Sequence, residues 1–274
     1  MKKLLGAIAA LAMTVGLAAC GTPANQGTTN PNQLVVGMEA GYPPFNWTQN
    51  DDSNGGVKIQ GTNQYAGGYD VEIAKLVAQK LGKELVIVKT EWDGLTPALI
   101  SGKIDAIIAG MSPTEERKAT IDFTDSYYDS QLVLVVKKGS KYANATSLAE
   151  FSGAKVTAQL NTFHYSVIDQ ITGVEKVTAM DNFPAMRVAL QAGTIDAYVS
   201  ELPEALSAQA ANSDFVMVKL SDGFKASPED TQTAVGVKKD SPLTKEINEA
   251  LKTISSEQRL EIMKNAIKNQ PAAE

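Results

Sequence analysis

The sequence contains one segment in two related copies, and this repeat constrains the fold more than any other feature. Residues 98–106 are ALISGKIDA, and residues 189–197, 91 positions later, are ALQAGTIDA. Each copy is typical of a helix end, a glycine that stops the helix, and an Ile-Asp-Ala entry into a buried strand. The repeat predicts two lobes of related construction. Chance similarity of a common helix–glycine–strand turn is the alternative.

Strand-like and helix-like segments alternate along the chain. Residues 34–37 and 85–88 are short apolar runs. Between them, the apolar residues of 71–81 fall on one helical face, with Asp70 expected as the N-cap and Gly82 as the stop. This alternation predicts an α/β fold in which each lobe is a mostly parallel sheet flanked by helices.

The expected crossings between the lobes are two strands at 132–136 and 233–237, beside charged or polar segments. Residues 243–267 are amphipathic and are expected to pack as a helix on lobe one. Because ligands of open α/β sheets sit beyond the C-terminal ends of the strands, a ligand cleft is expected between the lobes. The predicted division is lobe one at 33–135 plus 234–270 and lobe two at 136–233.

The N-terminal segment has the order of a targeting sequence. Residues 1–19 combine a short positive start with an apolar stretch, which predicts a secretory signal peptide. The ending Leu-Ala-Ala-Cys resembles the bacterial lipoprotein box, which implies cleavage before Cys20 and its diacylation. An ordinary signal peptide with an incidental cysteine is the alternative. With Cys20, residues 21–32 form the predicted tether to the outer face of the cytoplasmic membrane, in a single-membrane bacterium.

Composition excludes several classes of function. Lys and Arg number 25 against 31 Asp and Glu, and no basic run of the nucleic-acid-binding type is present. One cysteine and one histidine cannot form a Cys/His zinc cluster or an intramolecular disulfide framework. We therefore expect no nucleic-acid partner and no metal. We also expect no cofactor and a monomeric protein.

Arg117 and Glu201, which follow equivalent predicted strands of the two lobes, are the main candidates for ligand binding. Residues 112–115, Ser-Pro-Thr-Glu, form a predicted capping box, and Arg117 lies one turn inside that helix. Its planar guanidinium matches a carboxylate. Glu201 lies at the end of the equivalent strand of lobe two and suits an ammonium group. The alternatives are a surface arginine on a capped helix and a helix-capping glutamate before Pro203.

Aromatic and acidic residues follow other predicted strands. Tyr42 and Trp92 are placed to enclose a ligand, whereas Phe45 and Trp47 are expected to pack in the core. Glu39 either meets a cationic group or is solvated. The single histidine, His164, is expected to be structural or exposed, with a ligand contact as the alternative.

Several segments in a fixed order resemble one known family. They are YPPF at 42–45, GYDVEIA at 68–74, WDGLTPAL at 92–99, AGMSPTEERK at 109–118 and IDFTDSYY at 121–128. The ordered set resembles the polar amino-acid solute-binding proteins of ABC importers, family 3, from about Leu34 to Ile267. The resemblance implies a two-lobe, periplasmic-binding-protein-like fold. It also implies a protein that is not an enzyme, closes on an L-amino acid, and partners ABC permease and ATPase subunits.

The resemblance also implies roles for individual positions. Arg117 matches the residue that binds the α-carboxylate, and Glu201 matches the residue that binds the α-ammonium. In the loop 159–163, Phe163 stands where the family often has threonine, so whether Thr162 or Phe163 supports the carboxylate stays open. The implied ligand-binding set is Glu39, Tyr42, Trp92, Gly110, Met111, Ser112, Arg117, Gln159, Thr162, Phe163 and Glu201.

The residues of this set favour one class of ligand. The set contains no cation beyond Arg117 and includes Glu39, which argues against an acidic amino acid. Arginine or lysine suits an acid between aromatic walls. Glutamine is the nearest rival ligand. Two further hypotheses for the function are a dehydratase-like enzyme on the same fold and a ligand sensor without transport.

Overall fold

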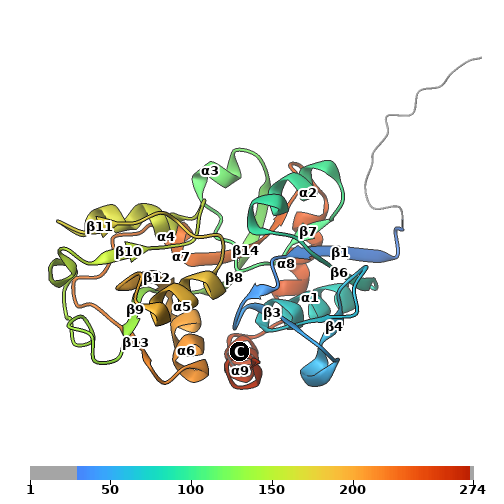
Figure 1. Cartoon of the computed structure of the whole chain (residues 1–274). Helices are drawn as coiled ribbons and strands as arrows, with labels where there is room; N and C mark the ends of the chain where they lie inside the picture. The colour runs from blue at the N-terminus through green and yellow to red at the C-terminus, as the bar shows by residue number, and fades with distance from the viewer. Residues whose placement is uncertain (1–29, 272–274) are drawn as a thin grey trace, which may run out of the picture.

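The computed structural model describes residues 30–271, so Cys20, the predicted signal peptide and most of the predicted tether lie outside the described residues. Figure 1 shows two α/β lobes side by side. In the first, the strand order is β6 (Glu84–Lys89), β1 (Gln33–Met38), β7 (Ala106–Ile107), β14 (Gln232–Val237) and β8 (Asp122–Asp129). In the second, it is β11 (Glu175–Lys176), β10 (Lys155–Thr157), β12 (Ala197–Glu201), β9 (Leu132–Lys137) and β13 (Phe215–Val218).

The two sheets are built alike, which confirms the two related lobes predicted from the repeat. In both, the first three strands are parallel and the last two pairings are antiparallel. The repeated aspartates also have the same role. Asp105 accepts a hydrogen bond from the Val35 backbone N–H at 2.9 Å, and Asp196 accepts one from the Lys155 backbone N–H at 2.9 Å. Each aspartate therefore ties the strand of the repeat to its neighbour.

Both sheets are mixed, but four of the five strands in each run in the same direction, which agrees with the mostly parallel sheets expected. The antiparallel strand in fourth position comes from the other half of the chain in each case. β9 follows directly from β8 of the first lobe, and β14 returns after the second lobe is complete. Such a strand has no crossover helix to carry it back to the same end of the sheet, so it runs antiparallel to its neighbours.

The chain changes sheet a few residues before the positions expected from the sequence. β9 begins at Leu132 and pairs only with β12 and β13, so the first crossing is at 130–131. The second crossing precedes Gln232, where β14 begins after the short helix α7 (Pro228–Thr231). The two crossings are neighbours, because the Ser130 N–H donates to the Thr231 carbonyl at 2.9 Å. An apolar strand does not indicate which sheet it joins, and this explains the offset.

The helices of each lobe pack against its sheet. In the first lobe these are α1 (Tyr69–Lys80), α2 (Leu95–Ser101) and α8 (Leu243–Leu251), and in the second α5 (Phe183–Ala192) and α6 (Leu202–Ala211). A small sheet of β2 (Gly41–Tyr42), β3 (Asn46–Gln49), β5 (Tyr65–Gly67) and β4 (Val57–Lys58) extends the first lobe.

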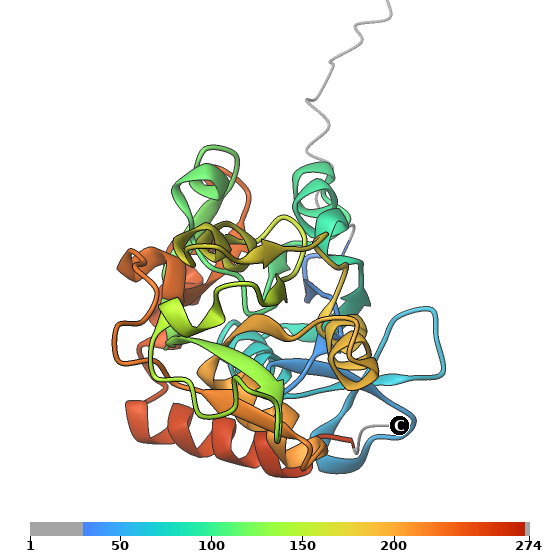
Figure 2. The same cartoon turned by 60° about the vertical axis from the view of Figure 1, so that its left-hand side comes forward.

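The C-terminal amphipathic segment is two helices, whereas a single helix was expected. It is interrupted before Ser255, whose side chain caps α9 (Ser256–Asn269). α9 packs against α1 of the first lobe but also against α6 of the second, as Figures 1 and 2 show. Gln270 donates to the Ser207 carbonyl at 3.0 Å, which ties the helix end to the second lobe.

The larger apolar core extends across the junction between the lobes. It fills the first lobe and continues into the second through Phe183, Met186 and Tyr198, all at most 1% exposed. Among residues 30–271, no helix combines the length and the apolar character needed to cross a bilayer.

Candidate functional site

A cavity of about 20 Å³ lies between the lobes, which is space for about one water molecule. Its first-lobe lining is Tyr42, Trp92, Gly110, Ser112 and Arg117, and its second-lobe lining is Gln159, Thr162, Phe163, His164 and Phe183. All the residues predicted to bind ligand therefore line it, except Glu39, Met111 and Glu201. An adjoining cleft of about 490 Å³ shares Trp92, Arg117, Thr162 and Phe163 and also includes Met111.

Arg117 bridges the two lobes through its guanidinium. Nη1 donates to the Ser112 carbonyl at 2.9 Å, and Nη2 donates to the Asn161 carbonyl of the second lobe at 3.1 Å. The guanidinium carbon lies 5.0 Å from the centre of the Trp92 ring. Burial lowers the pKa of Arg117 to about 10, so the group stays cationic at neutral pH. Within the described chain, no carboxylate forms an ion pair with it.

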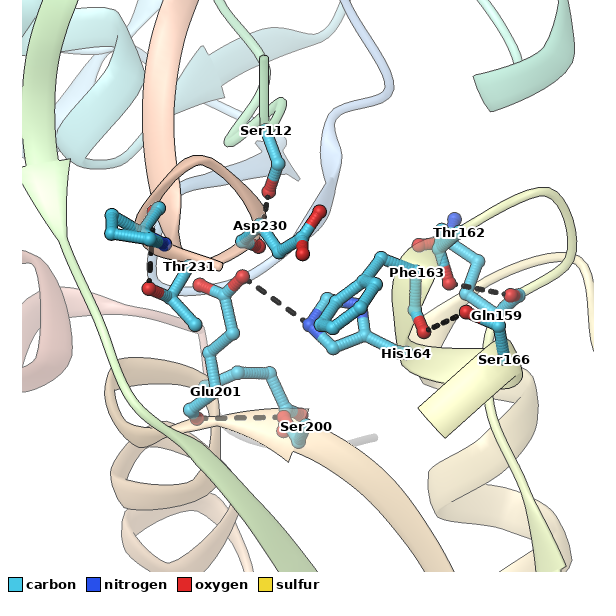
Figure 3. A network of polar contacts seen from close by, with 12 residues as sticks. Ser112, Gln159, Thr162, Phe163, His164, Ser166, Ser200, Glu201, Asp230 and Thr231 are labelled. Carbon is cyan, nitrogen blue, oxygen red and sulfur yellow. Dashed lines mark hydrogen bonds and ion pairs between the residues drawn. The ribbon is translucent and has the colours of Figure 1, made fainter. Parts of the chain in front are cut away.

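The helix that carries Arg117 begins two residues later than the predicted capping box implies. Thr114 is the N-cap of α3 (Glu115–Lys118), and its hydroxyl accepts from the Arg117 N–H at 3.4 Å. Threonine is itself a good cap, and the glutamates that follow it suit the first turn. The Ser112 hydroxyl instead donates to the Asp230 carbonyl at 3.0 Å, outside the helix (Figure 3).

Glu201 ends β12 and is fully buried. Although it occupies the N-cap position of α6, its side chain caps nothing. Among the described residues, neither carboxylate oxygen has a hydrogen-bond partner. The nearest cationic candidate is His164, whose Nε2 lies 3.2 Å from Oε1 without hydrogen-bond geometry. Figure 3 shows the two side chains pointing toward each other. A buried carboxylate with so few partners is costly unless a cation or donor meets it.

Glu39 also lies at the junction of the lobes, directly after β1. Only 5% of the residue is exposed, so it is not the solvated side chain of the sequence-based alternative. Nε2 of Gln159 lies 3.2 Å from each of its carboxylate oxygens. Burial raises the pKa of Glu39 to about 7, and the hydrogen bond from Gln159 opposes this shift. Glu39 lines a neighbouring groove of about 470 Å³ and meets the cavity lining at Gln159.

Aromatic rings form the apolar part of the junction. Tyr42 stacks on Phe183 of the second lobe with ring centres 4.4 Å apart, and on Phe45 at 4.9 Å. Phe45 and Trp47 are buried in the core, as predicted. The rings therefore supply flat walls beside the charged groups.

A buried polar chain positions Gly110 from behind. The Gly110 N–H donates to the Tyr127 hydroxyl at 3.1 Å, and this hydroxyl donates to Asp70 Oδ1 at 2.8 Å. Asn46 donates to Asp70 Oδ2 at 2.7 Å. The prediction of Asp70 as the N-cap of α1 is therefore wrong, and Gly68 takes that position. Asp70 is drawn inward because these polar groups converge there, and burial raises its pKa to about 7.

The family model of the bacterial extracellular solute-binding proteins, family 3, matches residues 34–267. The chain belongs to this family. The arginine-binding extracellular protein ArtP of Bacillus subtilis is 29% identical over 266 residues, covering 96% of this chain and 97% of ArtP. The B. subtilis ABC transporter glutamine-binding protein GlnH is 31% identical over 281 residues, covering 99% and 100%.

Solved structures agree with this family 3 assignment. The amino acid ABC transporter substrate-binding protein AbpA of Streptococcus pneumoniae, bound to L-arginine, has a TM-score of 0.74 and 27% identity. The match covers 86% of this chain and 95% of AbpA. Residues 34–267 contain both lobes and all the site residues described above.

Two residues at the centre of this family 3 site were not predicted to bind ligand. His164 was expected to be structural or exposed, with a ligand contact as the alternative, and no role was predicted for Phe183. Phe183 follows Trp92 by 91 positions, the interval of the repeat, and both line the cavity. Glu201 follows Gly110 by the same interval. Extending the repeat beyond its identical letters would have found Phe183, whereas no comparable signal marks His164.

Proposed function

We propose that this family 3 protein binds a polar L-amino acid between its lobes and delivers it to an ABC importer, with arginine or lysine favoured over glutamine. One observation carries the proposal. At the lobe junction, the hydrogen bonds of the Arg117 guanidinium within residues 30–271 go to neutral carbonyls, while two buried carboxylates, Glu39 and Glu201, contact other residues of the cavity lining, Gln159 and His164. This set of charges complements a zwitterion that carries one further positive charge.

In the proposed complex, Arg117 holds the α-carboxylate and Glu201 holds the α-ammonium. A planar guanidinium suits the carboxylate because it can donate two parallel hydrogen bonds. Glu39 then meets the cationic end of the ligand side chain, between the walls of Tyr42 and Trp92. The remaining residues of the predicted set, Gly110, Met111, Ser112, Gln159, Thr162 and Phe163, surround the α-groups.

Binding requires the lobes to separate, because a cavity of about 20 Å³ cannot admit an amino acid. The ligand then favours the closed arrangement through contacts that it makes with both lobes at once. Residues 130–131 and the segment before Gln232, where the chain crosses between sheets, are the proposed hinge. In this proposal the ABC permease distinguishes the closed form from the open one.

Glutamine remains the second candidate, since one relative is named as a glutamine-binding protein. Its side-chain amide would also donate to Glu39. A full cation gains more from a buried carboxylate than a neutral amide does, because charge-assisted hydrogen bonds are stronger. ArtP, named for arginine, and AbpA, solved with L-arginine bound, also support arginine.

Binding without turnover is part of the proposal, since the matched relatives are named as binding proteins. A sensor that transports nothing would have the same binding site. A measurement of amino-acid uptake distinguishes this sensor from an importer component. Loss of arginine uptake in a deletion strain would support the importer, and unchanged uptake in a strain without other arginine importers would support the sensor.

The N-terminal segment supports an anchored location. We propose that Cys20 carries two acyl chains, which hold a protein at a bilayer where one chain is marginal. The predicted tether then keeps the two lobes close to the permease and at high effective concentration. Labelling with a palmitate analogue tests this. The Cys20→Ala variant is expected to lose the label and to leave the membrane fraction.

A thermal-unfolding screen against the twenty amino acids tests the ligand. A ligand at about 100 times its Kd adds ~2.7 kcal/mol, which is about 5–10 °C for a protein of this size. A shift with arginine and lysine supports the proposed clamp and the role of Glu39. A shift with glutamine alone keeps the clamp and removes the argument from Glu39. The Arg117→Ala variant is expected to abolish every shift, and normal binding by it would contradict the clamp.

A further inference from the structure

We propose that His164 competes with the ligand's α-ammonium for Glu201, so that amino-acid binding by this protein is coupled to the loss of a proton. This inference rests on the proposed function and extends it to a residue outside the predicted ligand-binding set. In this inference His164 determines when the Glu201 end of the site accepts a cation.

The His164 imidazole lies where the proposed ligand ammonium would have to contact Glu201. His164 lies in the short helix α4 (Phe163–Ser166), is 8% exposed and lines the cavity between the lobes. Its Nε2 lies 3.2 Å from Glu201 Oε1, and its ring lies edge-on to Phe183 with centres 6.4 Å apart. Among the described residues, neither ring nitrogen has a hydrogen-bond partner. The imidazole therefore faces Glu201 without any competing polar contact.

The charge of the imidazole decides what Glu201 can accept. When His164 is neutral, an ionised Glu201 has no hydrogen-bond partner among the described residues, and an ammonium group there is strongly favoured. When His164 is protonated, it forms the ion pair itself, and an ammonium at Glu201 would meet a like charge a few ångströms away. Imidazole is the side chain whose charge ordinarily changes between about pH 5 and 8.

Other titratable groups surround this pair. Arg117 on α3 and Tyr42 on β2 share the cavity, and both keep their charge state near neutral pH, because burial lowers one pKa only to about 10 and raises the other well above its ordinary value. Asp230 on α7 faces the pair across the site in Figure 3, and burial and the nearby Glu201 raise the pKa of Tyr128 on β8 to about 12. Glu39 and Asp70 have pKa values of about 7. Protonation of Glu39 also weakens binding of a cationic side chain, so a pH profile of affinity alone does not isolate His164.

The single histidine of the chain makes its titration directly observable. In tag-free protein, the imidazole carbon-bound protons give one set of proton NMR signals, and these follow His164 alone. We expect saturating L-arginine to lower the titration midpoint of His164 by about one pH unit or more, because the bound ammonium favours the neutral ring. In the ligand-free Glu201→Gln variant the midpoint is also expected to fall, since the anion that stabilises the imidazolium is gone.

Calorimetry of arginine binding provides the second measurement. By linkage, the wild-type affinity falls up to about tenfold for each pH unit below the titration midpoint of His164 in the ligand-free protein. The His164→Gln variant is expected to lose this component and to keep only the component that Glu39 contributes. Thermal unfolding of each ligand-free variant checks that it is folded, and the wild-type NMR experiment needs no variant.

The outcomes separate the inference from the proposed function. Arginine binding that leaves the His164 midpoint unchanged or raises it would overturn the inference and keep the amino-acid-binding function. An equal pH slope in wild type and His164→Gln would do the same. Failure of the wild-type protein to bind any amino acid at pH 8 would contradict both. A lowered midpoint together with a reduced slope in the variant supports both.

Discussion

The side-chain amide of Gln159, in the second lobe, lies 3.2 Å from each carboxylate oxygen of Glu39, in the first lobe. The same amide also donates to the Asp181 carbonyl at 3.0 Å. One neutral side chain therefore satisfies a buried acid across the junction of the lobes. A cationic ligand that reaches Glu39 would replace the neutral Gln159 amide, which is shared with Asp181, by a charged donor.

The Glu39→Gln variant tests the choice between a cationic and a neutral ligand. The substitution removes the negative charge but keeps the size of the side chain and an amide that can still pair with Gln159. We expect arginine affinity to fall about 10- to 100-fold and glutamine affinity to change less than about threefold, because only the cation loses a charge-assisted partner. Calorimetry at pH 8, above the pKa of Glu39 at about 7, measures both. Unaltered arginine binding by a folded variant would contradict the assignment of Glu39 to the cationic end of the ligand.

Buried acids also predict how stability depends on pH. Burial raises the pKa of Glu39 from 4.5 to about 7 and that of Asp70 from 3.8 to about 7. At a pH between the ordinary and the raised pKa of each group, Glu39 and Asp70 keep protons in the folded protein that they have released in the unfolded chain. The free energy of unfolding therefore falls as pH rises through this window, on the order of 1–3 kcal/mol for each group between pH 5 and 8.

Urea unfolding of the ligand-free protein at pH 5 and pH 8 measures this dependence. The Glu39→Gln variant is expected to lose part of the slope, because the substituted side chain no longer titrates. Substitution of the exposed Glu175 by glutamine is the matched control and is expected to leave the slope unchanged. A Glu39→Gln variant as pH-dependent as wild type would show that Glu39 titrates alike in both states.

The sequence was sufficient to predict the two lobes because the repeat has a local physical basis. Asp105 and Asp196 each anchor a neighbouring strand, so the same residue type is needed at the same point in both lobes. The clustering of Arg117 with the Gln159–Phe163 loop was also predicted from the family resemblance, and the structure brings these residues to one cavity.

Other features depend on distant contacts that no local pattern contains. Asp70 looks like a helix cap from its neighbours, but Asn46 and Tyr127 draw it into the core. The sequence around Ser112 also predicts a helix cap, but in the structure Thr114 is the N-cap of that helix. His164 has no periodic or motif signal, because its position is set by a one-turn helix that faces Glu201.

The Arg117→Lys variant separates charge from shape at the proposed carboxylate site. The guanidinium spans two carbonyls, Ser112 and Asn161, and its planar fork leaves further N–H groups for a ligand. A lysine ammonium keeps the charge but concentrates its donors at one point. We expect amino-acid affinity to fall about 10- to 100-fold, less than in Arg117→Ala. Calorimetry measures the loss, with Lys118→Gln as the control for a neighbouring cation. Equal affinity in Arg117→Lys and wild type would exclude a bidentate contact.

Gly110→Ala tests whether the backbone three residues after β7 must lie close to the aromatic wall. Gly110 has φ of +61°, and a Cβ there would lie 2.7 Å from Cε1 of Tyr42. The ring would have to move from its stack on Phe183, where the centres are 4.4 Å apart. We expect the free energy of unfolding to fall by about 1–2 kcal/mol from the left-handed backbone alone, and amino-acid affinity to fall at least about tenfold.

Gly193→Ala is the matched control for this strain. Gly193 has φ of +73° at the end of α5, and a Cβ there would meet nothing within 4 Å. The two variants should therefore lose similar stability through their backbones, while only Gly110→Ala loses affinity through Tyr42. Urea unfolding and calorimetry on both variants separate the two effects. Equal affinity in the two variants would mean that Tyr42 is not part of the binding surface, and the aromatic wall would then rest on Trp92 and Phe183.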